Sequence, residues 1–197
     1  MADGNGVMNG NRGPWWVQLM QTVGPTAAII QVGACTFELD GPAPAPGGFE
    51  RTVALQSSLF AGGSIDISTI EWWRSRDHAA VERNAERLQA VLGDFITWFP
   101  ASNFLWANGA NFDPPVLESA FRSVGLTAPW KYNLVRDTRT LWHFAAELAG
   151  WEKPKRVVGH TALADARDVQ SAWRALKEKC GGEYWGSAGA QVDGQRP

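Results

Sequence analysis

Residues 15–37, WWVQLMQTVGPTAAIIQVGACTF, decide the fold of this chain. They contain two short apolar runs rich in β-forming residues, at 15–23 and 28–37, and Gly24-Pro25 separates the two runs. Short runs bounded by turn residues predict β-strands, so we expect an antiparallel pair. The second run is almost continuously apolar, which is typical of a strand covered on both faces. Alternation along it predicts one face with Ile30, Val32 and Ala34 and the other with Ile29, Gln31, Gly33 and Cys35.

Further strands and helices follow this pair along the chain. Residues 51–56 suggest a third strand of an antiparallel meander. Apolar residues recur at helical spacing through 79–99, and Asp137 or Thr138 could cap a later helix that ends at Gly150. This order of elements argues for an α/β sandwich around a mixed sheet. The other expected elements are a strand at 103–107 and helices at 68–73, 114–123, 138–149 and 161–180.

The composition indicates one domain with tails. The chain has 197 residues, of which 45% are hydrophobic, and this is enough for a sizeable core. It has neither a long apolar run typical of a membrane span nor the pattern of a signal peptide. Its two cysteines lack metal-ligand spacing, so a reducing, cytoplasmic setting is the default. We expect a flexible leader at 1–14, one folded domain at 15–180 and a flexible tail at 181–197.

The charge of the chain is unevenly distributed. The net charge is −2, so the whole chain does not resemble an electrostatic binder of nucleic acid. Residues 130–160 nevertheless contain six basic and three acidic side chains. This segment has two interpretations, a local patch that faces phosphates or ordinary solvated side chains, and the counts alone do not separate them.

Three segments carry side chains suited to chemistry. In WANGANFDPPVLESAF at 106–121, Asp113 follows a strand and opens a helix, and in GHTALADA at 159–166, His160 stands five residues before Asp165. The third segment is LMQTVG, at the end of the first strand. Taken singly, each residue has an ordinary explanation. Asp113 could cap its helix, Asp165 could be a solvated carboxylate, and His160 could be a structural histidine.

Together and in this order, these segments resemble the DnaQ-like (DEDDh) 3'-5' exonucleases, which carry four carboxylates in three motifs and a histidine five residues before the last aspartate. Two more segments, STIEWWRSRDHAAVERN at 68–84 and PWKYNLVRDTRTLW at 129–142, look like the phage and bacterial branch that contains DexA and exodeoxyribonuclease VIII. The similarity extends over 15–173. A generic α/β domain unrelated to nucleases is the less favoured interpretation.

The resemblance implies an α/β fold with a ribonuclease H-like mixed sheet flanked by helices. It implies hydrolysis of single-stranded DNA or RNA from the 3' end. It also implies a location in the cytoplasm of a bacterial cell, with a phage gene as one possible source of the protein. It implies no membrane, and it leaves the oligomeric state open with a homo-oligomer as one possibility, because related exonucleases often form dimers or larger assemblies. DNA and RNA are not separated, since no residue is identifiable as a sensor of the 2'-hydroxyl group.

The resemblance also implies a two-metal mechanism. Two Mg²⁺ or Mn²⁺ ions clamp the scissile phosphate and lower the pKa of an attacking water. Asp165 would hold the first metal, and Asp113 would support the metal site through metal-bound water. His160 would take the proton from the attacking water as general base.

The first motif of this chain lacks the carboxylates of the family pattern, Asp-x-Glu-Thr-x-Gly. The matching run begins at Leu19, which replaces the Asp, and Gln21 replaces the Glu; a shifted register places Gln18 and Met20 there and fails equally. Two remaining carboxylates can hardly neutralise two divalent cations. We therefore expect weak metal binding and impaired hydrolysis. The alternative is a catalytically inactive exonuclease-like module that binds nucleic acid or protein.

Other residues are weaker candidates for the site. Trp72 could stack on a terminal base or pack within its helix. Asn111, like Asn108, could orient the segment around Asp113 or bond to the local backbone. Arg136 is a candidate substrate contact within the basic segment. Asp137 could be catalytic, although a helix cap beside an arginine is the favoured role.

Overall fold

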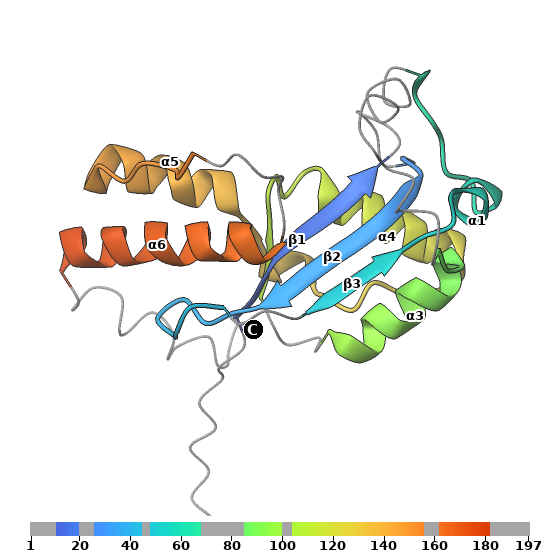
Figure 1. Ribbon diagram of the computed structural model, residues 1–197, viewed down its shortest axis with the longest axis horizontal. Coiled ribbons are helices and arrows are strands. Elements are labelled where there is room, and N and C mark those ends of the chain that lie inside the picture. The colour runs from blue at the N-terminus through green and yellow to red at the C-terminus, as the bar shows by residue number, and fades with distance from the viewer. Residues whose placement is uncertain are drawn as a thin grey trace, which may run out of the picture.

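The computed structural model describes residues 11–19, 26–44, 48–67, 85–99, 104–155 and 162–181, with the backbone alone for 11–19. In these residues five strands form one mixed sheet, in the order β3-β2-β1-β4-β5, and helices flank it (Figure 1). The strands are β1 (Asn11–Leu19), β2 (Ile29–Thr36), β3 (Phe49–Thr52), β4 (Phe104–Ala107) and β5 (Val135–Asp137). The helices are α1 (Leu55–Phe60), α3 (Leu88–Trp98), α4 (Asp113–Ser123), α5 (Thr138–Ala149) and α6 (Ala162–Cys180), with a 3₁₀ turn at Tyr132–Leu134.

The strand directions confirm the predicted meander and the predicted fold class. β1 pairs antiparallel with β2, and β2 pairs antiparallel with β3. β4 runs parallel to β1 on the other side, and β5 runs parallel to β4. A mixed sheet of this kind, flanked by helices, is the ribonuclease H-like arrangement that the sequence predicts.

The register of β1 and β2 differs from a regular ladder. β1 begins at Asn11, four residues before the expected start of the strand. Its pairing shifts between Gln18 and Leu19, where Leu19 lies opposite Ile29. The predicted alternation along β2 is wrong at this irregularity. Ile29 packs with Val32 in the main core, whereas Ile30 lies in a separate small cluster.

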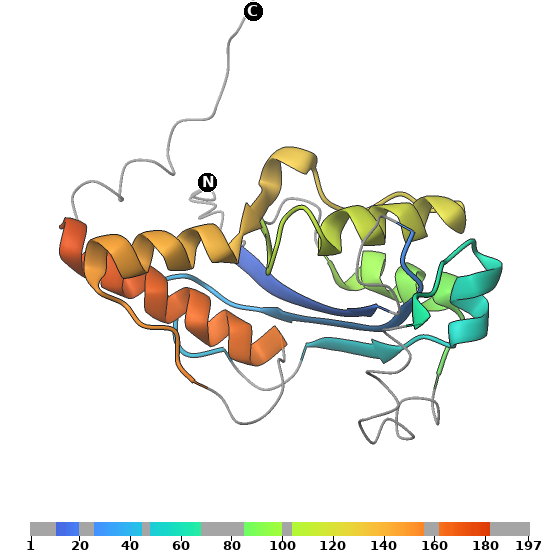
Figure 2. The same ribbon diagram turned by 90° about the horizontal axis from the view of Figure 1, so that it is seen from above.

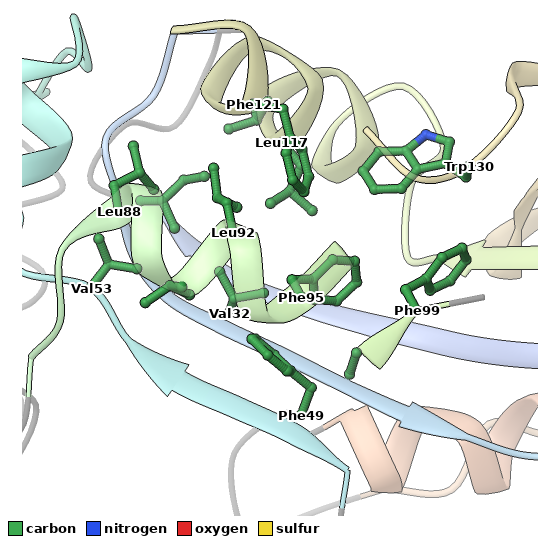
Figure 3. Packing of buried hydrophobic residues seen from close by; sticks show 14 of the residues in the cluster. Val32, Phe49, Val53, Leu88, Leu92, Phe95, Phe99, Leu117, Phe121 and Trp130 are labelled. Carbon is green, nitrogen blue, oxygen red and sulfur yellow. The ribbon is translucent and has the colours of Figure 1, made fainter. Parts of the chain in front are cut away.

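The first face of the sheet packs against α3 and α4. Phe95 of α3 is fully buried and lies edge-on to Phe49 of β3, with their ring centroids 5.0 Å apart. Figure 3 shows how Phe95 and Phe121 meet over this face, with Trp130 beside them. Trp130 also donates a hydrogen bond from Nε1 to Oε1 of Glu118, at 3.0 Å. Aromatic burial on this scale is a major source of stability, so α4 is held in a fixed position against the sheet.

The second face packs against α5 and α6, which lie side by side (Figure 2). Trp106 of β4 points to this face, while its neighbours Leu105 and Ala107 point to the first face, as alternation along a strand requires. Ala166 and Val169 of α6 are fully buried here. Since β4 is covered on both faces, the loop that follows it starts from a rigid point.

Two expected elements differ from the structure. Residues 55–60 form the short helix α1, so the expected strand at 51–56 is wrong after Thr52. Of the helix expected at 79–99, residues 79–84 lie outside the described residues, and the described helix begins at Leu88, because Glu86 forms a bridge with Val53 and is therefore extended. The short helix expected at 68–73 lies outside the described residues. In the described part of the chain, none of the helices is long and apolar enough to cross a membrane.

Candidate active site at the ends of β4 and β5

The carboxyl ends of β4 and β5 meet at one edge of the sheet because the two strands are parallel, and this edge is where α/β proteins commonly bind ligands. The loop 108–112 leaves β4 there and leads into α4 at Asp113. Asp137 ends β5 at the same edge, one residue before α5 begins. Two of the residues that the sequence marks as chemically interesting, Asp113 and Asp137, therefore lie next to these two strand ends.

Asp137 ties the two strand ends together. One of its carboxylate oxygens, Oδ1, accepts hydrogen bonds from the backbone N–H groups of Arg139 at 2.7 Å and Thr140 at 3.3 Å. The other, Oδ2, accepts from the backbone N–H of Ala110 at 2.9 Å. The helix-cap interpretation of Asp137 is thus confirmed, and the same side chain fixes the loop after β4 to the start of α5.

A second contact joins this loop to α5. Nε of Arg139 donates a hydrogen bond to Oδ1 of Asn108 at 2.9 Å. Gly109 lies between them with a φ of +111°, a conformation that favours glycine. A Cβ atom on Gly109 would lie 3.8 Å from Cζ and Nη1 of Arg139. Asn108 therefore positions the guanidinium group of Arg139 over the loop. The side chain of Asn108 thus contacts a distant residue rather than the local backbone alone.

Asp113 and Asp165 are both buried carboxylates. Asp113 is 7% exposed and Asp165, in the first turn of α6, is 1% exposed, so the explanation of Asp165 as a solvated side chain is wrong. Asp113 is the first residue of α4 and follows the N-cap Phe112, and no side-chain cap bond is formed at this helix start. The explanation of Asp113 as a helix cap is therefore wrong as well.

The ionisation of Asp113 reflects these surroundings. Burial raises the pKa of Asp113 to about 7, the nearby charge of Arg139 lowers it, and the charge of Asp165 raises it. The structure thus brings Asp113 and Asp165 within electrostatic range of each other. A buried carboxyl group beside a second one either holds a proton near neutral pH or requires a compensating cation.

β2 approaches this region at Cys35. Burial and, to a smaller extent, the charge of Asp165 raise the pKa of the Cys35 thiol to about 12, so Asp165 lies near this part of β2. Cys35 pairs with Gly13 of β1. Leu19 pairs with Ile29 instead. Along β1, Leu19 lies roughly 20 Å from Gly13, at about 3.3 Å per residue. The backbone register does not bring Leu19 to Cys35, and its place in the carboxylate site stays a prediction.

The remaining predicted residues have different outcomes. Nη1 of Arg136 donates hydrogen bonds to the carbonyl oxygens of Asn133 at 2.7 Å and Val135 at 2.9 Å, and its guanidinium lies over the Phe104 ring at 4.5 Å. These contacts hold Arg136 at the sheet edge, and its role in substrate binding stays a prediction. Asn111 is exposed in the loop before α4. Four of the predicted residues lie outside the described side chains: Leu19, Gln21, Trp72 and His160.

Sequence reasoning missed Arg139. One signal was present, because Asp137 as a cap places Arg139 in the first turn of α5. A cation near the positive end of a helix is electrostatically unfavourable, so its presence there calls for a partner or a function. The partner, Asn108, is 31 residues away in the chain and was not predictable from local patterns.

The carboxylates fit a divalent cation only in part. Asp113 and Asp165 supply hard oxygen ligands, and a bound cation would offset the cost of keeping both ionised. In the ranges that the structure describes, no group of three or more His, Cys, Asp or Glu side chains is placed to hold a metal ion. Among the described residues, these two carboxylates are too few ligands for the pair of cations that the two-metal mechanism requires.

Comparison with protein families gives one match. The family model described as the 3'-5' exoribonuclease Rv2179c-like domain matches residues 17–177. The match covers most of the chain and includes Asp113, Arg139, His160 and Asp165. A search of the curated proteins finds no match.

Proposed function

Because the chain belongs to the Rv2179c-like family of 3'-5' exoribonuclease domains, and so has a 3'-5' exonuclease-type function, we propose that it acts on the 3' end of single-stranded RNA. The observation that carries this proposal is the pair of buried carboxylates, Asp113 and Asp165, at the sheet edge. A buried carboxyl group whose pKa is raised by burial and by a charged neighbour, as that of Asp113 is, is typical of functional sites. Single-stranded DNA is the alternative substrate.

The residues have separate roles in this proposal. Asp113 and Asp165 would hold one Mg²⁺ or Mn²⁺ ion, which when bound neutralises phosphate charge and acidifies water. His160 would accept the proton of the attacking water, as its position five residues before Asp165 suggests. This His160–Asp165 spacing also supports the DEDDh arrangement, and the segments at 68–84 and 129–142 support the DexA-like branch. A cytoplasmic setting, a phage origin and a homo-oligomer belong to the same proposal.

We propose further that hydrolysis is impaired in this chain. Leu19 and Gln21 stand where the family pattern has carboxylates, and neither offers an anionic oxygen. With two carboxylates in place of four, a second cation would be held weakly or not at all. The same observation favours one other function, RNA binding without hydrolysis. In that case the domain would keep the binding site at the sheet edge and would no longer cleave RNA.

Release of nucleotides from a labelled single-stranded RNA tests these proposals. The unmodified protein with Mn²⁺ should release little. The double change Leu19→Asp with Gln21→Glu should raise release by on the order of 10² or more, since a lost electrostatic contributor commonly costs this much. Asp165→Ala in the repaired protein should abolish the gain.

A second repair serves as the matched register control. Gln18→Asp with Met20→Glu places the same two carboxylates one residue earlier along β1. Recovery in this variant alone would move the first motif by one residue. Strong activity of the unmodified protein that Asp165→Ala abolishes would contradict the proposed impairment. No activity in either repaired protein, with folding intact, would favour the RNA-binding function.

A further inference from the structure

Arg139 stands at an unusual place for a cation. It is exposed in the first turn of α5, where the helix dipole is positive and a basic side chain is disfavoured. No acidic side chain shares that turn of the helix. The residues in the first turn of α5 therefore do not explain the position of this charge. An explanation has to come from the neighbouring loop after β4.

The guanidinium group of Arg139 is held in place by a hydrogen bond from Nε, while its two terminal nitrogens have no partner among the described residues. Its Nε is bonded to Asn108, and Asp137 fixes both the backbone of Arg139 and the loop that carries Asn108. Within the described residues, no hydrogen bond or ion pair engages Nη1 or Nη2 of Arg139. Gly109 lacks a side chain beside Cζ and Nη1, so the loop does not cover the group. A rigid anchor at Nε with two open terminal nitrogens leaves a fork that can bind two oxygens of one anion.

The charge of Arg139 acts at the carboxylate site. It lowers the pKa of Asp113, so the two groups are near each other, yet the described contacts include no ion pair between them. Arg136, which directly precedes the cap residue Asp137 in β5, provides the contrast. Its Nη1 is occupied by two backbone carbonyls and its face by Phe104. Among the described contacts, Arg139 thus has both terminal nitrogens open to a ligand, whereas Nη1 of Arg136 is already occupied.

We propose that Arg139 is a substrate-binding residue that holds a backbone phosphate of the RNA strand whose 3' end lies at Asp113 and Asp165. Asn108 is its positioning residue, and Asp137 fixes both. Forked binding of two phosphate oxygens would fix the strand relative to the carboxylates and would offset part of the repulsion between phosphate and carboxylate. This inference rests on the proposed function.

Equilibrium binding of a short oligouridylate labelled at its 5' end, measured by fluorescence anisotropy over a salt series in EDTA, tests the inference. Arg139→Gln should weaken binding about tenfold and reduce the slope of log affinity against log salt by about 0.7, the value for one phosphate on a single strand. Arg139→Lys should retain the slope and lose part of the affinity. Asn108→Ala should cause a smaller loss than Arg139→Gln, because the charge remains but its anchor is gone.

The control variant is Arg122→Gln, which removes an exposed arginine from the last turn of α4, at the other end of that helix from Asp113. It should bind as the unmodified protein does. If Arg139→Gln keeps both affinity and slope, or loses affinity with an unchanged slope, the inference is overturned while the proposed function stands. If the unmodified protein binds no RNA, the proposed function fails and the inference fails with it. Circular dichroism of each variant identifies any loss of folding, and Arg139→Lys and Asn108→Ala then carry the test.

Discussion

At the scale of single residues, the burial of Asp113 has a cost that depends on pH. Its pKa is about 7 in the folded protein against an ordinary value of 3.8, so the folded state binds the proton more tightly. Stability associated with this group is therefore fully present below pH 3.8 and is lost as the pH rises to about 7. Above that range the buried carboxylate lowers the free energy of unfolding by an amount on the order of 4 kcal/mol at most.

The variant Asp113→Asn removes this cost and should stabilise the protein at alkaline pH. We expect its melting temperature to exceed that of the unmodified protein at about pH 8 and the difference to shrink toward about pH 4.5. Thermal denaturation at the two pH values measures this. An equal loss of stability at both would show that the carboxylate is compensated by a group outside the described residues.

A divalent cation should act on the same pair of carboxylates. If Mn²⁺ binds at Asp113 and Asp165, it should raise the melting temperature at about pH 8. The gain in unfolding free energy is about 2.7 kcal/mol at a concentration one hundred times the dissociation constant. Asp165→Asn should lose most of this shift. An unmodified protein that melts at the same temperature with and without Mn²⁺ would rule out a cation at this pair.

At the scale of elements, Asp137 joins β5, α5 and the loop after β4 through three hydrogen bonds. Asp137→Ala removes the helix cap and also leaves the N–H of Ala110 without this acceptor. We expect a loss of about 1–3 kcal/mol in the free energy of unfolding, measured by urea denaturation. Asp137→Asn is the matched variant, because one amide oxygen can replace only part of these bonds, so its loss should be intermediate. Equal stability of the unmodified protein, Asp137→Ala and Asp137→Asn would contradict the proposed stabilising role of these three hydrogen bonds.

The sequence predicted the elements whose signals are local. The ends of α5 follow from Asp137 as N-cap and from Gly150, whose φ of 65° matches the left-handed C-cap. The start of α3 was not predictable in this way. Glu86 exchanges backbone hydrogen bonds with Thr52 and Ala54, so the chain stays extended where the helical periodicity continues. These partners are more than thirty residues away, and no local pattern contains them.

At the scale of the whole molecule, the site is assembled from segments far apart in the chain. Motif spacing predicted Asp113 and Asp165, because each stands in a recognisable local segment. It gave no indication that Asp113 has a pKa near 7, since burial and the neighbouring charges arise only when α4, α5 and α6 meet the sheet. Arg139 was missed for the same reason, as its partner Asn108 comes from another strand end.

The two cysteines make it possible to measure how often α6 separates from the sheet. Cys180 is exposed at the end of α6, whereas Cys35 is 2% exposed and its thiol has a pKa of about 12. Alkylating reagents attack the thiolate, so Cys180 should react at once and Cys35 only when the sheet separates from α6. In Cys180→Ala, the rate of iodoacetamide labelling at Cys35 therefore reports how often the carboxylate side of the molecule opens. Labelling at the rate of a free thiol would mean that α6 leaves the sheet freely, and RNA that lowers the labelling rate would bind to the closed form.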